Sequence, residues 1–488
     1  MRTHTTPFKK TFMNTSNTPH PVNKVAVLAI ILVSYLMTVL DISIVITALP
    51  KIEQDMHFTT AELTWVQSLY TLTFGGFLLM GARAGDIFGR RRMFVIGLAV
   101  FMASSLVIGL SPSAQWMLSA RAVQGVGSAI LAPSTLALMS TYFAEGQERT
   151  RAVSYYGATA GVGSSIGMVL GGVFADWLSW RVGFFINLPI GLALMYGALR
   201  YLKETERRSG QLDVVGALTS TMGMGSLIFG IVRAASEGWG NSLTMLTLGF
   251  GGLLLVFFVW NESRVTQPIL PLRLFANRER VGAYLGRLLF LGAMVGFWFF
   301  TTHFLQGVLG YTPFQAGIAF LPTTIFNFGA ALAVTRLTQY LGGGAMGNGR
   351  LLLIGLLIDL VGMLWLAQVS ADTTYLSGVA LPMILLGIGQ GFTLSPLTVA
   401  GITGVRAEDA GAASGMVNVS HQMGGSLGLS ILAVVFAMVH TSATADAAIL
   451  AHRIASVFLG AALMLSVAMV VVWWLIVRAR VVQAQVAQ

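Results

Sequence analysis

The chain of 488 residues contains no cysteine, which excludes disulfide bonds and thiolate chemistry. Charge is also scarce, because only 10% of the residues are Asp, Glu, Lys or Arg, against about 25% in soluble proteins. A soluble protein of this length divides into domains with polar surfaces, and so few charges could not coat them. Hydrophobic residues make up 55% of the chain, which indicates that lipid surrounds most of it.

The apolar residues form continuous runs near the ~20 residues that a helix needs to cross a bilayer, without the alternation of barrel strands. Since backbone polar groups must be paired in hydrocarbon, these runs predict helices. The polar first 23 residues and the long run after them argue against a cleavable signal peptide. We predict an all-α polytopic membrane protein with 14 transmembrane helices, at 25–49, 62–82, 93–111, 115–141, 152–175, 182–201, 213–234, 243–260, 281–307, 314–335, 351–369, 374–400, 411–439 and 450–477.

Basic residues are distributed unevenly between the predicted loops. Three arginines at 90–92 follow the second span, and most other Lys and Arg lie on the side of the two termini, whereas the opposite side keeps Lys51, Arg181 and Arg453. By the positive-inside rule both termini are cytoplasmic. The net charge of +10 is therefore a topology signal, and we expect no nucleic-acid partner.

Two short internal matches indicate a repeat. The stretch 92–98 resembles 350–356, and 131–135 resembles 394–398, at a similar offset of roughly 260 residues in both cases. Parallel repeats of this kind place a substrate site near the bilayer midplane, between the two halves. The predicted organisation is a cytoplasmic tail (1–24), a six-helix half (25–201), a linker with an inserted helical hairpin (202–260), a cytoplasmic loop (261–280), a second six-helix half (281–477) and a tail (478–488).

The loop at 81–92 follows the second predicted span and is a tight, basic turn with one acidic residue. Asp86, Gly89 and Arg90 fit the signature of the major facilitator superfamily, which the chain resembles at this point. The resemblance implies that these residues form a conformational latch against the helix that begins near Gly411, whose dipole favours an acid there. A plain basic membrane anchor is the alternative interpretation.

Further stretches resemble the fourteen-helix drug:proton antiporters of that superfamily, which are multidrug efflux transporters. One departure is Met168, which stands where the antiporter motif of the fifth helix carries proline. The resemblance extends over nearly the whole chain, through the stretches 40–50, 121–127, 163–172, 180–189, 305–317 and 414–418.

Asp41 is a charge inside an apolar run. It precedes Pro50 by nine residues, or about 14 Å along the helix from the outer end. Such a residue faces a cavity or a partner, and desolvation favours the neutral form of a carboxyl group, so that protons can be taken up and released. Arg121 is the expected partner, because the resemblance implies that the first and fourth helices are neighbours. Proton coupling and a permanent structural ion pair are both open.

Small residues spaced by four allow helices to approach closely, and such a spacing occurs in the fifth predicted span. Tight packing explains it, while the resemblance implies an antiporter motif that keeps the cavity sealed, at Gly163, Gly167, Gly171 and Gly172.

The resemblance also suggests polar residues for a substrate cavity, although lone polar residues in such spans more often make hydrogen bonds between helices. These residues are Gln124, His303, Asn327, Gln390 and His421. The sequence has no glycine-rich phosphate loop with lysine and no histidine cluster with metal-ligand spacing, so we expect no cofactor and no metal.

We therefore expect a secondary active transporter rather than an enzyme. The resemblance implies proton-coupled export, by alternating access, of lipophilic and cationic drugs or toxic compounds across a bacterial inner (plasma) membrane. The expected partners are such small molecules, protons and the lipid bilayer, with a monomer as the expected state. The alternatives are a facilitator or symporter of another solute, a lipid transporter on the same fold, and a sensor or scaffold that transports nothing.

Overall fold

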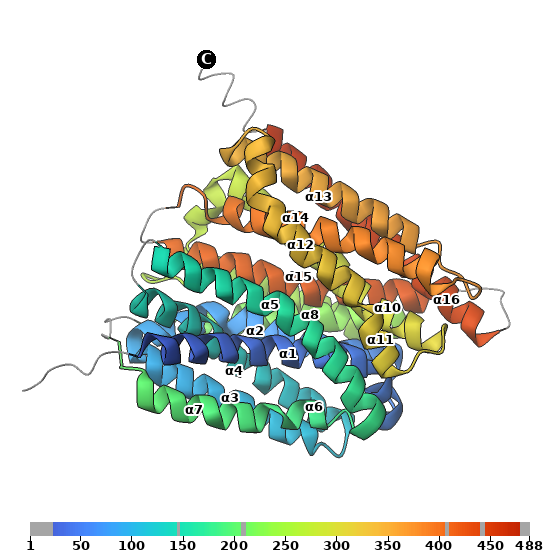
Figure 1. Ribbon diagram of the computed structural model, residues 1–488, viewed down its shortest axis with the longest axis horizontal. Coiled ribbons are helices and arrows are strands. Elements are labelled where there is room, and N and C mark those ends of the chain that lie inside the picture. Colours follow the sequence, from blue (N-terminus) through green and yellow to red (C-terminus); the bar gives the residue numbers. More distant parts are fainter. Residues whose placement is uncertain (1–22, 144–146, 206–210, 406–408, 440–444, 479–488) are drawn as a thin grey trace, which may run out of the picture.

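The computed structural model describes residues 23–143, 147–205, 211–405, 409–439 and 445–478, so the predicted tails lie almost entirely outside the described residues. The described chain is a bundle of long helices joined by short connections (Figure 1). The helices are α1 (Lys24–Met56), α2 (Thr60–Phe88), α3 (Arg90–Gly109), α4 (Ala114–Tyr142), α5 (Gln147–Val173), α6 (Val182–Phe185), α7 (Asn187–Tyr201), α8 (Val214–Glu237), α9 (Ser242–Arg264), α10 (Arg278–Gly307), α11 (Pro313–Ala319), α12 (Leu321–Tyr340), α13 (Gly344–Leu366), α14 (Leu381–Ile402), α15 (Ala410–Met438) and α16 (Asp446–Val472), with short π or 3-10 segments at η1 (Phe174–Leu178), η2 (Leu272–Ala276), η3 (Leu376–Ala380) and η5 (Trp473–Val477).

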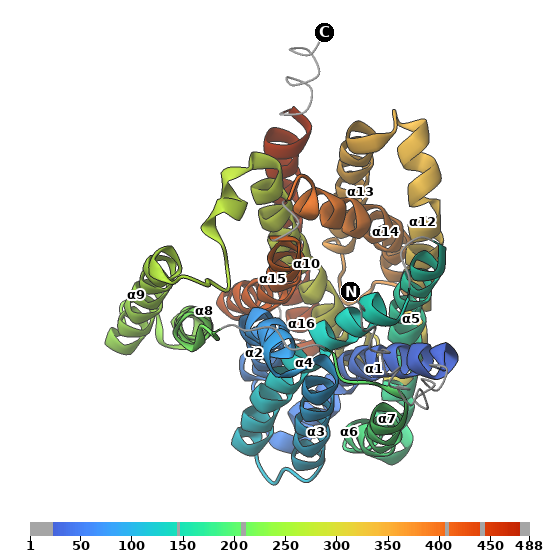
Figure 2. The same cartoon turned by 90° about the vertical axis from the view of Figure 1, so that its left-hand side faces the viewer.

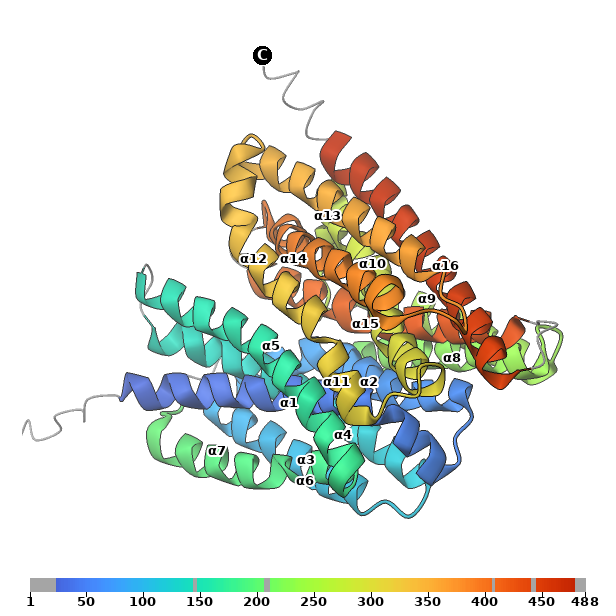
Figure 3. The ribbon, with the colours of Figure 1, turned by 45° about the vertical axis from the view of Figure 1, so that its right-hand side comes forward.

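Twelve helical segments of the described chain are long and apolar enough to cross a membrane. The predicted all-helical membrane fold is therefore confirmed. The predicted count of fourteen spans is not, because twelve of the described helical segments qualify as spans. The two helices outside this count are α2 and α5. Helix α2 has 29 residues but carries Glu62, Arg83 and Asp86. Helix α5 has 27 residues, and its stretch Val162–Leu178, counted together with η1, is apolar but shorter than a span. Both nevertheless run beside the apolar helices, α2 against α4 and α5 against α1 (Figure 3).

Two groups of helices, α1–α7 and α10–α16, form the bundle, and α8 and α9 lie outside it (Figure 2). Helix α8 packs against α2 and α15, which belong to different groups, while α9 packs against α8. Along the contact of α2 with α15, a Cβ on Gly75 would lie 2.8 Å from Gln422, and Ser426 Oγ donates to the carbonyl oxygen of Ser68 at 3.0 Å. The hairpin therefore covers one seam between the two halves.

The second seam joins α1 and α5 to α10 and α11, near the ends that the charge distribution assigns to the outer side. Gln306 Nε2 donates to the carbonyl oxygen of Thr47 at 3.0 Å, and a Cβ on Gly317 would lie 2.4 Å from the carbonyl oxygen of Met168. Helix α5 ends directly beyond this contact in the π-helical turn η1. Met168, which stands where the motif carries proline, therefore lies within the regular part of α5, and the π-helical turn begins only at Phe174.

Candidate functional site

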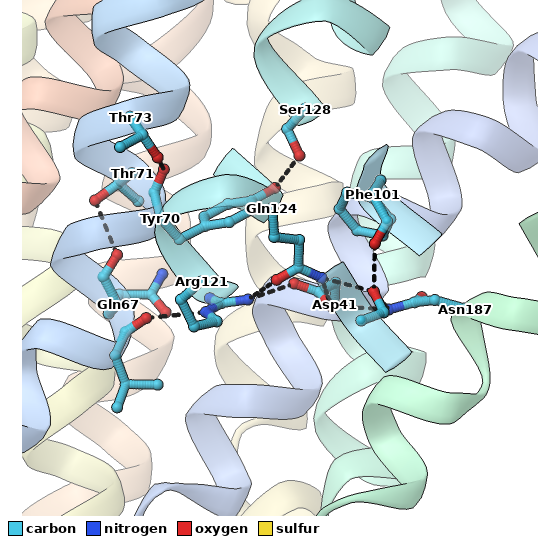
Figure 4. Close-up of polar contacts among 12 residues, drawn as sticks. Asp41, Gln67, Tyr70, Thr71, Thr73, Phe101, Arg121, Gln124, Ser128 and Asn187 are labelled. Atoms are coloured by element: carbon cyan, nitrogen blue, oxygen red, sulfur yellow. Dashed lines mark hydrogen bonds and ion pairs between the residues drawn. The ribbon is translucent and has the colours of Figure 1, made fainter. Parts of the chain in front are cut away.

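Asp41 lies within α1 with only 1% of its surface exposed, and three side chains from other helices surround its carboxylate (Figure 4). Arg121 Nη1 on α4 donates to Oδ2 at 2.7 Å. Gln124 Nε2, also on α4, donates to Oδ1 at 2.8 Å, and Asn187 Nδ2 on α7 donates to the same oxygen at 2.9 Å. Both carboxylate oxygens therefore have partners, and the charge is balanced within the chain.

Arg121 is completely buried, and its Nε and the face of its guanidinium contact α2, while its Nη2 has no hydrogen-bond partner among the described residues. Its Nε donates to the carbonyl oxygen of Val66 at 3.0 Å, and its guanidinium carbon lies 4.4 Å from the centre of the Tyr70 ring. The two helices can approach because Gly125 faces α2, where a Cβ would lie 2.4 Å from the carbonyl oxygen of Tyr70. Arg121 thus connects α1, α2 and α4 at one point.

Sequence analysis identified Asp41, Arg121 and Gln124 but missed two members of this network. Asn187 begins α7, and Ser105 Oγ on α3 accepts from Gln124 Nε2 at 2.9 Å and from Asn187 Nδ2 at 3.2 Å. Asn187 stands out in the sequence as a lone amide within an apolar stretch, but residue type alone cannot distinguish a member of this network from an ordinary link between helices.

A cavity of about 310 Å³ lies between the two halves, lined from α1, α2 and α5 on one side and from α10, α12, α14 and α15 on the other. This volume is at the lower end of the range for small-molecule sites, roughly 300–1,000 Å³. Of the predicted cavity residues, Asn327, Gln390 and His421 line it, while Gln124 and His303 do not.

The two exceptions have partners elsewhere. Gln124 is turned toward Asp41, and His303 lies toward the outer end of α10, where its Nε2 is 3.4 Å from a carboxylate oxygen of Glu53. The predicted cavity set is therefore divided because sequence position fixes the depth of a residue in a helix but not which neighbour it faces.

The cavity lining is neutral. Ten of its seventeen residues are apolar or aromatic, seven are polar, and none is Asp, Glu, Lys or Arg. Ile42 and Ser43 line the cavity, but the carboxylate of Asp41 faces Arg121 instead. The lining therefore offers no carboxylate to balance the positive charge of the cationic substrate that the resemblance implied.

The predicted latch residues form a compact turn between α2 and α3. Asp86 and Arg90 are ion-paired, and Arg90 Nη1 also donates to the carbonyl oxygen of Ala82 at 3.0 Å. Gly89 has φ of 103°, a backbone conformation that glycine adopts readily and other residues rarely do.

The turn is held by the linker after α7. Glu204 accepts hydrogen bonds from the backbone N–H groups of Arg91 and Arg92, both at 3.0 Å, which caps the first turn of α3 with a negative charge. Glu204 lies outside the 81–92 loop and was not predicted from the sequence.

The start of α15, where the latch is expected to dock, lies against the same end of α2, since a Cβ on Gly415 would meet the side chain of Leu79. Among the described residues, the hydrogen bonds and ion pair of Asp86 and Arg90 stay within the turn and the linker after α7, so docking of the latch on α15 stays a prediction.

The glycines of α5 divide between two partners. Gly163, Gly167 and Gly171 face α1, and a Cβ on Gly171 would lie 2.6 Å from the carbonyl oxygen of Ile44. Gly172 faces the other half, where a Cβ would lie 2.5 Å from the carbonyl oxygen of Pro313. Helix α5 is therefore in backbone contact with both halves at the outer end.

A helical membrane protein with two halves around a central cavity has the architecture of a solute transporter. Residues 31–429 match the family model described as Major Facilitator Superfamily, and the chain belongs to this family of membrane transporters. The resemblance noted from the 81–92 loop is thus confirmed at the level of the superfamily, and the protein is a multi-pass membrane transporter.

Among curated proteins, the chain is similar to the cephamycin export protein of Amycolatopsis lactamdurans, at 38% identity over 408 residues that cover 82% of this chain and 83% of that one. It is also 37% identical to the puromycin resistance protein of Streptomyces alboniger, covering 83% and 80% of the two chains. A multidrug resistance protein of Mycobacterium tuberculosis is 34% identical over 82% of this chain and 74% of that protein. Antibiotic export and resistance are thus the recurring activities of its relatives.

Among solved structures, the chain resembles a bacterial homologue of the human lysosomal transporter Spinster in an inward-facing, unoccupied conformation. The TM-score is 0.65 at 15% identity, and the alignment covers 92% of this chain and 96% of that one. A nucleoside transporter matches with a TM-score of 0.62 at 13% identity, over 92% and 99% of the two chains. At such low identity these likenesses show the fold alone.

Proposed function

We propose that the protein is a proton-coupled antiporter that exports lipophilic drugs or toxic compounds across the bacterial plasma membrane. The observation that carries the proposal is the buried carboxylate of Asp41, which is 1% exposed and directly precedes the cavity residues Ile42 and Ser43. Two similar proteins, a cephamycin export protein and a puromycin resistance protein, support the substrate class.

The coupling follows from the charges of the pair. While Asp41 is ionised, its attraction to Arg121 ties α1 to α4. Protonation from the outer side removes that attraction, and α1 gains freedom to shift relative to α4. Because Ile42 and Ser43 continue the same helix into the cavity wall, a shift of α1 changes the shape of the cavity and promotes release of the bound compound.

The proposal includes fourteen spans with both termini in the cytoplasm. Helices α2 and α5 have 29 and 27 residues, and at about 1.5 Å per residue each is about 40 Å long, enough to cross a hydrocarbon core of about 30 Å. Within this topology we assign Asp86, Gly89 and Arg90 to a cytoplasmic latch, and the α5 glycines to the outer seal between the 25–201 and 281–477 halves.

The test is Asp41→Asn in reconstituted vesicles. We expect normal expression, because asparagine keeps an oxygen for Arg121, and loss of drug-dependent proton movement measured with a pH-sensitive dye. Asp55→Asn is the matched control, since Asp55 lies on the same helix but pairs with Arg181 at the outer end. Proton movement that persists unchanged in Asp41→Asn would contradict the proposal. Uptake in the direction of the proton gradient by the unaltered protein would instead indicate symport.

A further inference from the structure

Arg287 is a second buried arginine in the membrane-spanning bundle, and it is only 8% exposed. It lies nine residues after the start of α10, or about 14 Å along the helix. Its Nη1 donates to Thr398 Oγ1 on α14 at 2.7 Å, and its Nη2 is 3.2 Å from His421 Nδ1 on α15. Three helices of the second half therefore meet at this side chain.

The partners of Arg287 are neutral. Among the described residues it forms no ion pair, and its Nε is buried without a hydrogen-bond partner. Of the five N–H donors of a guanidinium, the two hydrogen bonds use two. The other buried arginines differ: Arg121 pairs with Asp41, and Arg280 donates to backbone carbonyl oxygens near the helix end. A buried charge without a counter-ion is costly, so it favours an anion supplied from outside the chain.

Arg287 is connected to the central cavity through His421, which touches Arg287 and also lines the cavity. Leu291, one turn further along α10, lines the cavity as well. An anion that enters the cavity thus reaches the imidazole first. By taking the place of the imidazole on Arg287, the anion would replace a hydrogen bond to an uncharged acceptor with an ion pair that supplies the missing counter-charge.

We propose that Arg287, Thr398 and His421 form the recognition site for an anionic group, such as a carboxylate, of the exported compound. The planar guanidinium matches the two oxygens of a carboxylate, while the apolar majority of the lining receives the rest of the molecule. This inference rests on the proposed export function and specifies its substrate class as lipophilic anions. It replaces the cationic substrates expected from the family resemblance.

The test uses 1-pyrenebutyrate and its methyl ester, which differ in charge but share the same apolar body. Binding to the purified full-length protein is measured by fluorescence titration. We expect the carboxylate to bind the unaltered protein more tightly than the ester. Arg287→Gln should weaken carboxylate binding on the order of tenfold or more, as expected for a hydrogen bond to a charged group, and change ester binding less than about twofold.

Two further variants keep the test decisive. Arg287→Lys retains the charge without the planar fork, and we expect carboxylate binding between that of the unaltered protein and Arg287→Gln. Arg336→Gln removes an exposed arginine and should leave both affinities unchanged. Gel filtration and melting curves check that each variant folds. If Arg287→Gln does not fold, the comparison of the two probes on the unaltered protein and on Arg287→Lys decides.

Equal binding of carboxylate and ester, or equal losses for both in Arg287→Gln, would overturn the inference. So would displacement of 1-pyrenebutyrate by millimolar inorganic phosphate, because the site would then belong to small inorganic anions. The result of this binding test does not depend on whether the proposed export is correct. Binding is measured without a proton gradient, so the site can fail while Asp41-dependent proton movement persists, and the reverse result is equally recognisable.

Discussion

The two halves of the transporter differ in whether a buried arginine has a charged partner. In the first half, Asp41 and Arg121 neutralise each other at 2.7 Å, with Gln124 and Asn187 completing the network. In the second half, Arg287 has only neutral partners among the described residues. A charge that is balanced within the chain holds helices together, whereas a charge that is not balanced is available to a ligand.

Asp359 extends the comparison within the second half. It is completely buried between α13 and α14, where Thr393 Oγ1 donates to its Oδ2 at 3.3 Å, while its Oδ1 has no partner among the described residues. No described basic residue pairs with it. Sequence analysis offered no account of Asp359, and its position shows that it contacts α14 rather than lipid.

The largest effect should come from breaking the balanced pair. Arg121→Ala leaves the carboxylate of Asp41 buried without its counter-charge, and we expect a loss of about 3–5 kcal/mol in the free energy of unfolding. Denaturant unfolding in detergent measures this loss. Arg181→Ala, which removes a partly exposed ion pair with Asp55, should cost less than about 1 kcal/mol. Equal losses in the two variants would remove the distinction drawn between buried and exposed pairs.

An intermediate effect is expected where the halves meet. Gly172→Ala places a methyl group 2.5 Å from the carbonyl oxygen of Pro313, so the backbones must separate. We expect a loss of about 1–3 kcal/mol in unfolding free energy, together with reduced export. Gly252→Ala on α9 is the control, because nothing lies within 4 Å of its Cβ position. If both variants behave alike, this contact does not hold the halves together.

The smallest effect should be that of Asp359→Asn. Asparagine keeps the oxygen that accepts from Thr393 and removes an ionisable group from a site without a described counter-charge. We expect the unfolding free energy to change by less than about 1 kcal/mol and transport to continue. Thermal unfolding and vesicle assays measure both. A loss comparable to that of Arg121→Ala would mean that Asp359 also has a charged partner and that the halves are alike.

The helical membrane fold could be predicted because it depends on composition. The Asp41–Arg121 contact could be predicted from the depth of the two residues together with the family resemblance, which implied that their helices are neighbours. A charge inside an apolar run is visible in one dimension, and depth follows from counting residues. The count of spans was less secure because α2 carries Glu62, Arg83 and Asp86, which lower its apolar character although it packs inside the bundle.

Contacts that depend on helix rotation could not be predicted. His303 has the depth expected of a residue near a cavity, yet it faces Glu53. Arg287 and His421 are separated by 134 residues, so their contact depends on how α10 and α15 pack. Likewise, Glu204 caps α3 from a linker, and no local pattern connects it with the arginines at 91 and 92.

The outer seam is made largely of main chain, since Gly172 lies against the carbonyl of Pro313 and Gly317 against that of Met168. The cavity below it is made of side chains from seven helices. These two parts can therefore diverge independently over evolution. Substitutions in the cavity wall can change which compound fits the cavity, while the close backbone contacts of the seam stay unchanged.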